Sequence, residues 1–306
     1  MNTDNTEKLL NLALELECRV MHNEPLSEHT TFKVGGNCTA MIDVSSEDAL
    51  AQLCLSAKEY GVRTMVLGKG SNILCDDRGF NGVVLLMGGS IDDIFMVNET
   101  TIYAQAGCSL VKLCRFALEH SLSGLEFAYG IPGTVGGAIY MNAGAYGGEI
   151  KDVIKSCTSI DSKGFIHTLE ADALELSYRH SVFSHNNEII TGGLFELAPA
   201  NYDDIQDKMV ELMGKRRSKQ PLEYPSAGST FKRPEGQFAG KLIQDSGLRG
   251  YSVGGAQVSE KHAGFVINKN NATCGDILTL IKDVKKIVQE KTGYMLECEV
   301  KYIPYE

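Results

Sequence analysis

The chain has 306 residues, an apolar fraction of 43% and a formal net charge of −10. This length predicts about two domains, and the apolar fraction is typical of a protein that folds around hydrophobic cores. The negative charge and the lack of a long basic run argue against a protein that binds nucleic acid or a membrane surface. A local basic patch that binds a small anionic ligand is compatible with the negative net charge and with the lack of a long basic run.

The nine cysteines are an odd number, and no pair has the C-x-x-C spacing of a zinc knuckle or a redox dithiol. Residues 1–8 are polar and lack the apolar centre of a signal peptide. No apolar run is long enough to span a bilayer. We therefore expect a cytoplasmic protein with reduced cysteines, no metal site and no obligate protein partner.

The first part of the chain predicts helices alternating with short strands. Apolar residues recur at helical spacing over residues 5–20, which predicts an amphipathic helix. A strand is expected over residues 39–44 and a helix over residues 47–60, with an acidic first turn after a serine N-cap. A short apolar strand over residues 64–67 then leads into a glycine-rich loop, residues 68–74.

This first glycine-rich loop does not fit the two best-known nucleotide motifs. Arg63 stands where a Walker P-loop has its first glycine, and Ile73 stands where a dinucleotide-binding G-x-G-x-x-G motif has its third. Taken alone, the loop is best interpreted as an ordinary tight turn.

A second glycine-rich stretch, residues 124–148, is the feature around which the chain is organised. It follows β-rich runs within residues 81–107 and a predicted helix over residues 110–120. Its eight glycines are interspersed with bulky apolar residues, unlike those of a flexible linker. Successive backbone N–H groups in such a loop form anion-binding nests. We therefore interpret both glycine-rich stretches as a cradle for a phosphorylated ligand.

Strands are expected again over residues 155–198, and the composition changes near residue 200. A charged helix over residues 201–219 ends in a basic run and is followed by two prolines. The last third predicts helices over residues 239–247 and 275–291 and a closing strand over residues 296–302. We expect two domains, residues 1–200 and residues 201–306.

Taken together, these blocks resemble the UDP-N-acetylenolpyruvoylglucosamine reductase (MurB) family, and the short spacing after residue 183 resembles its shorter, type II branch. The matching blocks are residues 29–36, 66–74, 124–148, 178–183, 227–234, 239–272 and 297–300. The resemblance implies an α+β fold: a two-lobed FAD-binding region of the vanillyl-alcohol-oxidase (PCMH) type, residues 1–200, and a smaller α/β substrate domain, residues 201–306.

The resemblance also implies bound FAD, NADPH as co-substrate and UDP-N-acetylglucosamine enolpyruvate as substrate. The family reaction reduces the enolpyruvyl ether to a lactyl ether, giving UDP-N-acetylmuramate for peptidoglycan synthesis. Hydride from NADPH reaches C3 by way of the flavin, which carries the difficult chemistry. The protein then has to stabilise an enolate and supply a proton to C2.

Three catalytic residues are implied: Arg179, Ser229 and Glu299. Arg179 would hold a carboxylate bidentately, although a lone arginine is more simply a structural salt bridge. Ser229 is implied as the proton donor to C2, although a Gly-Ser-Thr turn equally suits a helix N-cap. Glu299 shares a predicted strand face with Glu297 and Lys301, which an exposed strand also explains. Beside a substrate carboxylate, it is expected to stay neutral and donate a hydrogen bond.

The same resemblance implies two sets of binding residues. For FAD, backbone N–H groups and edge contacts are expected from Leu67, Gly68, Gly70, Ser71, Asn72, Ile73, Tyr129, Pro132, Gly133, Gly136, Gly137, Ile139, Asn142 and Gly144. For the UDP-sugar, contacts are expected from Tyr178, Lys219, Arg233, Gln257 and His262. His262 is equally consistent with a structural hydrogen bond, and His29 is interpreted as structural.

Two other functions stay open from the sequence. An FAD-dependent oxidase or dehydrogenase of a small alcohol on the same fold predicts oxygen consumption without a need for NADPH. A nucleotide-binding regulator without turnover predicts a colourless protein.

Overall fold

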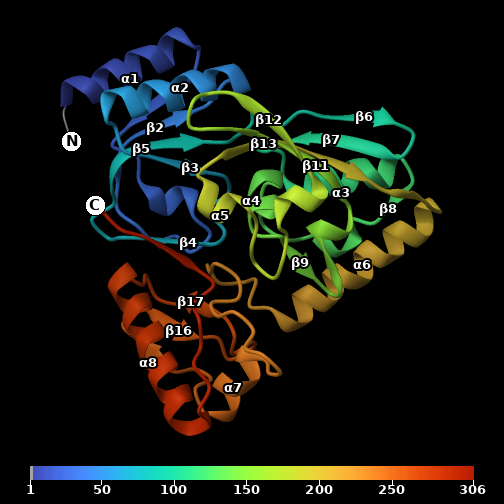
Figure 1. The fold of residues 1–306 in the computed structure, drawn as a ribbon. Coiled ribbons are helices and arrows are strands. Elements are labelled where there is room, and N and C mark those ends of the chain that lie inside the picture. The colour runs from blue at the N-terminus through green and yellow to red at the C-terminus, as the bar shows by residue number, and fades with distance from the viewer. Residues whose placement is uncertain (1–2) are drawn as a thin grey trace. The chain divides into compact units, whose positions relative to one another are not determined.

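A computed structural model of the chain describes residues 3–306, which form two compact units (Figure 1). Unit 1 comprises Met1–His22, Ala40–Lys69 and Gly82–Lys215. Unit 2 comprises Asn23–Thr39, Gly70–Asn81 and Arg216–Glu306. Within residues 3–306, no helix combines the length and apolar character needed to cross a lipid bilayer.

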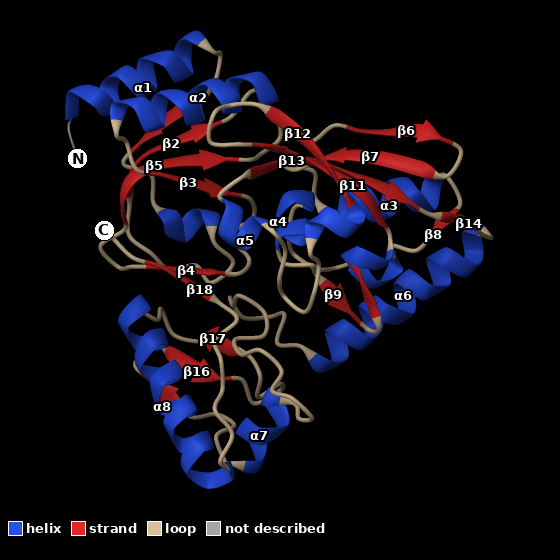
Figure 2. Ribbon diagram, in the orientation of Figure 1, coloured by secondary structure: helices blue, strands red, loops and turns tan. Residues whose placement is uncertain are grey.

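The first part of unit 1 is a four-stranded sheet covered by two helices. The strand order is β1 (Arg19–His22), β2 (Cys38–Asp43), β5 (Phe80–Leu86), β3 (Thr64–Leu67). The pair β1–β2 is antiparallel and the pair β3–β5 is parallel. Helices α1 (Thr3–Glu15) and α2 (Glu47–Tyr60) pack against each other and lie over one face of this sheet (Figure 2). Strand β3, which runs parallel to β5, ends at Leu67. The first glycine-rich loop therefore begins at the carboxyl end of this strand.

The boundaries of α2 follow from its sequence. Ser46 is the N-cap, and its hydroxyl accepts a hydrogen bond from the Ala49 amide at 3.1 Å. Gly61 ends the helix in the left-handed conformation, with φ of 64°, which glycine adopts without a steric cost. The predicted helix over residues 47–60 is therefore confirmed.

The second part of unit 1 is a five-stranded antiparallel sheet. Its order is β12 (Ile166–Glu170), β11 (Ile154–Ile160), β13 (Ile189–Glu196), β7 (Thr101–Gln105), β6 (Ile94–Asn98). Helices α3 (Leu110–Glu119) and α4 (Val135–Tyr140) pack together, and α4 packs on β7 and β13. The second glycine-rich stretch is thus partly helical and is held against a buried sheet.

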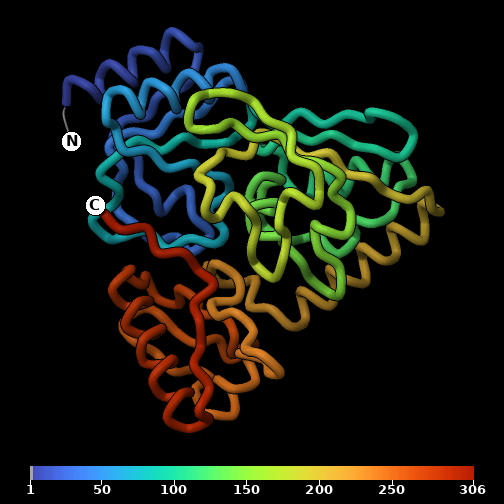
Figure 3. Tube along the Cα trace, viewed as in Figure 1, coloured from blue at the N-terminus to red at the C-terminus, as the bar shows by residue number. Residues whose placement is uncertain are grey.

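Unit 2 is assembled from three separate segments of the chain. Its three-stranded sheet has the order β15 (Ser252–Val253), β16 (Ala256–Val258), β17 (Val266–Asn268), with α7 (Ala239–Asp245) and α8 (Cys274–Thr292). The early strand β4 (Ile73–Cys75) pairs in parallel with the C-terminal β18 (Lys301–Ile303), and Figure 3 shows these two segments side by side. The Asn268 amide donates to the Phe32 carbonyl at 3.1 Å, which ties a further early segment to this unit.

The division of the chain differs from the expected boundary near residue 200. The passage into unit 2 falls between residues 215 and 216, inside helix α6 (Tyr202–Lys219), and unit 2 also takes two segments from the first third of the chain. The reason is the long-range pairing of β4 with β18, which leaves no periodic signal in the sequence. The assignment of FAD and substrate to particular parts of the chain stays a prediction.

Two predicted elements need correction. The helix expected over residues 5–20 ends at Glu15, because Glu17 turns into the left-handed conformation with φ of 58° and Val20 then lies in β1, opposite Ile42. The strand expected over residues 296–302 is regular only over Lys301–Ile303.

Asp77 gives a test of how unit 2 is assembled. Its carboxylate accepts hydrogen bonds from the amides of Cys274 and Gly275, at 2.7 and 3.0 Å, at the N-terminus of α8. Because a carboxylate is favoured at this end of a helix, Asp77→Ala is expected to lower the free energy of unfolding by about 1–2 kcal/mol. Urea denaturation followed by circular dichroism measures this, with the exposed Glu235→Ala as control. An unchanged midpoint for Asp77→Ala would contradict the role of this contact.

Candidate active site

The first glycine-rich loop approaches the second at Gly68. A Cβ atom on Gly68 would lie 2.5 Å from the hydroxyl oxygen of Thr134, closer than real Cβ contacts allow. Leu67, just before it, is buried at the end of β3. The backbone of Gly68 in the first glycine-rich stretch therefore lies directly against the side chain of Thr134 in the second. A residue larger than glycine does not fit at position 68.

The same loop continues into unit 2, where its next glycine is also enforced by packing. Gly70 has φ of 57°, and a Cβ there would lie 2.2 Å from the carbonyl oxygen of His29. The Thr31 amide donates to the Gly70 carbonyl at 3.2 Å. The block around His29 therefore supports this loop through its backbone. Further along, the Asn72 amide nitrogen donates to the Glu299 carbonyl at 3.2 Å.

The second glycine-rich stretch uses much of its own hydrogen-bonding capacity internally. Thr134 is the N-cap of α4 and accepts from the Gly137 amide at 3.3 Å. The Gly136 amide donates to the Ala106 carbonyl at 2.9 Å, and a Cβ at this glycine would lie 2.9 Å from that of Ala106. Gly136 was expected to offer its N–H to a pyrophosphate; instead, that N–H is used within the chain, and the glycine allows close packing.

Two other expected cofactor contacts are also engaged within the protein. Ile139 is fully buried, and a Cβ on Gly193 would lie 2.7 Å from its terminal carbon, so its side chain belongs to the core. Asn142 is fully buried, and its amide nitrogen donates to Glu149 and to the Ser177 carbonyl at 3.0 Å. Both hydrogens of that amide are therefore used, and Asn142 acts by holding neighbouring segments in place.

Arg179 lies at the tip of a tight turn that Asn142 anchors. The amide of Ser177 donates to the His180 carbonyl at 3.2 Å, and the reverse bond measures 3.1 Å. Arg179 has φ of 55°, at the second central position, where a type II turn normally has glycine. Such a conformation costs a non-glycine residue about 1–3 kcal/mol and tends to persist at functional sites.

The side chain of Arg179 is oriented by its neighbours in unit 1. Its guanidinium carbon lies 5.2 Å from the centre of the Tyr178 ring, and a terminal nitrogen is 3.5 Å from the Gly144 carbonyl. The buried Ser181, just after the turn, donates from its hydroxyl to the Tyr140 carbonyl at 2.7 Å. The turn is thereby fixed to α4 and to the second glycine-rich stretch, which brings Tyr178 and Arg179 beside expected cofactor residues.

Ser229 and Glu299 lie on adjacent backbone segments of unit 2. The Glu299 amide donates to the Thr230 carbonyl at 2.8 Å, and Ser229 forms an isolated antiparallel bridge with Phe265. Ser229 precedes no helix, so the alternative of an N-cap does not hold. Thr230 is fully buried and accepts from the Val266 amide at 3.0 Å, which fixes the backbone next to Ser229.

The expected substrate residues of unit 2 lie in different local surroundings. Lys219 is the last residue of α6. The guanidinium carbon of Arg233 lies 4.7 Å from the ring centre of the exposed Phe238. The side-chain amide of Gln257 donates to the Gly250 carbonyl, just before β15, and to the Ser252 hydroxyl, which indicates a structural role.

His262 retains one donor. Its Nδ1 accepts from the Gly264 amide at 3.1 Å, and burial lowers the pKa of its imidazole. The neutral ring therefore carries its proton on Nε2, where it is able to donate.

Sequence reasoning missed the residues that hold the Arg179 turn. Ser177 and Ser181 stand two residues before and after Arg179, and a short hydroxyl side chain near an Arg in a turn, here Ser181, was the available signal.

Two family models match parts of this chain. A model described as an FAD binding domain matches residues 39–170. A second, described as the UDP-N-acetylenolpyruvoylglucosamine reductase C-terminal domain, matches residues 220–303. The chain is 49% identical over 288 residues to a protein of Lachnoclostridium phytofermentans with this reductase name, covering 93% of each chain. A protein of Geobacillus kaustophilus with the same name is 47% identical over 290 residues, covering 95% of each.

A solved structure is similar to the chain over nearly its whole length. It is the MurB reductase of Thermus caldophilus, with a TM-score of 0.79 and 33% identity, covering 94% of this chain and 99% of that one. The matches define an FAD-containing oxidoreductase with an α+β fold. The chain belongs to the UDP-N-acetylenolpyruvoylglucosamine reductase family. The predicted family, fold class and FAD cofactor are thus confirmed.

The glycine-rich stretches of unit 1 fit an FAD site. Where Gly68 meets Thr134, only a residue without a side chain leaves the backbone bare, as phosphate binding by backbone groups requires. Leu67, Gly68, Tyr129, Pro132, Gly133, Gly137 and Gly144 stay predicted FAD contacts in unit 1, and Gly70, Ser71, Asn72 and Ile73 in unit 2.

Gly68→Ala tests this close approach. The new methyl group forces the two loops apart, and such overpacking costs about 1–3 kcal/mol. We expect less flavin per protein molecule, measured by the ratio of flavin to protein absorbance after gel filtration. Gly89→Ala is the matched control, because a Cβ there meets nothing within 4 Å. Equal flavin content in the two variants would contradict the placement of the cofactor cradle.

Proposed function

We propose that the chain catalyses the NADPH-dependent reduction of UDP-N-acetylglucosamine enolpyruvate to UDP-N-acetylmuramate, a step of peptidoglycan precursor synthesis in the cytoplasm. Family membership supports this activity, because the relatives carry the reductase name. When bound, FAD supplies hydride transfer between the nicotinamide and the double bond. The residues of the chain have to bind the substrate, stabilise negative charge and deliver one proton.

The observation that carries the proposal is the strained, anchored position of Arg179. An arginine with φ of 55° replaces the glycine expected at the tip of the turn, and buried Asn142 and Ser181 hold that turn in place. A permanently charged guanidinium suits the substrate carboxylate, whose negative charge spreads into an enolate after hydride addition at C3. We assign this stabilising role to Arg179.

Ser229 completes the reduction in this proposal. Hydride at C3 leaves the electron pair on C2, and the Ser229 hydroxyl transfers its proton there; water then restores the hydroxyl. Glu299, on the neighbouring segment, is assigned a hydrogen bond to the substrate carboxylate while it is neutral. Tyr178, Lys219, Arg233 and the Nε2–H of His262 remain the predicted contacts to the UDP-sugar.

The proposal is tested by following NADPH oxidation by the purified yellow protein with and without UDP-N-acetylglucosamine enolpyruvate. We expect NADPH consumption that depends on this substrate. Oxidation that proceeds equally without it would reject the reductase assignment.

A further inference from the structure

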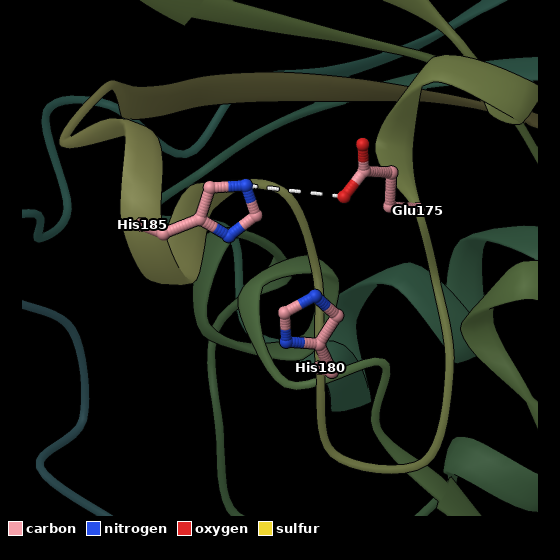
Figure 4. A group of neighbouring side chains, drawn as sticks. All are labelled: Glu175, His180 and His185. Atoms are coloured by element: carbon pink, nitrogen blue, oxygen red, sulfur yellow. Dashed lines mark ion pairs between the residues drawn. The ribbon is translucent and has the colours of Figure 1, made fainter.

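Three metal-ligating side chains converge beside the Arg179 turn in unit 1. Glu175 precedes the turn, His180 ends it, and His185 lies on the short helix α5 (Phe183–Asn186). One ligand atom from each lies within 4.8 Å of the others. Figure 4 shows the three side chains facing a common space, with Nε2 of His185 3.9 Å from a carboxylate oxygen of Glu175.

The hydrogen bonds around His180 select the tautomer that a metal needs. The Ser184 hydroxyl donates its only proton to the Ser181 carbonyl, at 2.6 Å. The same oxygen lies 3.0 Å from Nδ1 of His180, so it accepts there and Nδ1 is the donor. The lone pair of the neutral ring is therefore on Nε2, which faces Glu175 and His185 (Figure 4). A ligating histidine typically donates its other ring N–H in this way.

The backbone holds the three ligands on a fixed frame. Glu175 has φ of 50°, and Asn187, just after α5, has φ of 58°. The Val182 amide donates to the Leu174 carbonyl at 2.9 Å, which closes the segment between Glu175 and His180. The rings of His180 and His185 are nearly parallel, with centres 5.7 Å apart and 14° between their planes. Leu174 and Phe183 are buried and anchor both ends of the segment.

We propose that Glu175, His180 and His185 form a binding site for a transition-metal dication of the Zn²⁺ class. Two imidazoles and one carboxylate suit zinc, with the fourth position left to water. Mg²⁺ and Ca²⁺ are disfavoured because they require oxygen ligands. In a tetrahedral site, zinc–ligand bonds of about 2.0–2.2 Å place ligand atoms about 3.3–3.6 Å apart. The side chains of Glu175 and His185 are exposed, so they have room to move together around an ion.

The proposed site departs from the expectation that the chain has no metal site. The spacing Glu-x₄-His-x₄-His matches none of the usual zinc motifs, so the sequence alone does not indicate it. A bound ion links residues on both sides of Tyr178 and Arg179 and so restrains the turn that carries them. The binding proposal does not depend on the catalytic role of Arg179.

Isothermal titration calorimetry of the FAD-loaded protein with ZnCl₂ tests the site. The wild type is expected to bind one equivalent of Zn²⁺. In His185→Ala and Glu175→Gln, the affinity for Zn²⁺ is expected to be at least ~100-fold lower. Both substitutions fall on exposed side chains, so the fold is retained. His167→Ala is the matched control, because His167 also pairs with a carboxylate, that of Asp161, elsewhere in unit 1. Ser184→Ala is expected to weaken binding by about 10–100-fold, because it removes the partner of His180 Nδ1.

Zinc binding by cysteines would not produce this difference between the wild type and the variants. Burial raises the pKa of Cys54 and of Cys75 to about 12, and a thiol binds metal as the thiolate. Any zinc taken up by cysteines is moreover common to all the variants. Equal zinc stoichiometry and affinity in wild type, His185→Ala and Glu175→Gln would overturn the proposal.

Discussion

Replacing Ser229 by alanine is expected to lower kcat for enolpyruvyl reduction by about 10²–10⁴-fold. This is the range that a positioned general acid contributes. Hydride addition at C3 still generates the enolate, but protonation at C2 then depends on water. The fold should tolerate the change, because the neighbouring Thr230, rather than Ser229, holds the backbone through its buried hydroxyl. Steady-state NADPH oxidation at saturating substrate measures the loss.

Two controls separate an acid role from a structural one. Ser226→Ala removes a hydroxyl three residues away in the same segment and is expected to keep full activity. The visible absorbance of Ser229→Ala should still bleach when NADPH is added, because that half of the reaction does not need the hydroxyl. Normal turnover by Ser229→Ala would show that another group protonates C2.

Arg179→Gly is expected to separate activity from stability. Glycine accepts φ of 55° without strain, and this gain offsets its greater backbone entropy and the lost contact with Tyr178. We expect the free energy of unfolding to change by no more than about 1 kcal/mol. Activity should fall by about 10²–10³-fold, the loss typical when one donor to a developing oxyanion is removed.

Arg179→Lys distinguishes charge from geometry. Lysine keeps the positive charge but lacks the planar fork, so we expect an intermediate activity. Chemical denaturation and steady-state kinetics are compared on the same preparations. Retention of wild-type activity by Arg179→Gly would contradict the assignment of this guanidinium to the enolate.

The sequence was sufficient for elements whose signals are local. Helix α2 has a serine cap, an acidic first turn and a terminal Gly61, and it begins and ends as predicted. The first helix was predicted too long because Leu16 and Val20 continue the apolar spacing, while pairing of Val20 with Ile42 places that residue in a strand. Tertiary pairing here overrides the helical period.

Features that depend on residues far apart in the sequence could not be predicted from local sequence patterns. Pairing of β4 with β18 joins residues more than two hundred positions apart and gives unit 2 its discontinuous composition. The glycines were predicted to be ordered, and at Gly136 the structure shows a local reason, since its N–H donates to Ala106 and a side chain there would meet that residue. Asn142 was expected at the cofactor, and only its buried hydrogen bonds reveal that it anchors the Arg179 turn.

The central claim is tested most directly by the mass of the UDP-sugar after incubation with the wild-type protein and NADPH. The account predicts that UDP-N-acetylglucosamine enolpyruvate is converted to a product heavier by one hydride and one proton, with one NADPH consumed for each molecule formed. An unchanged sugar would contradict the account, and oxygen consumption that needs no NADPH would favour an oxidase on the same fold.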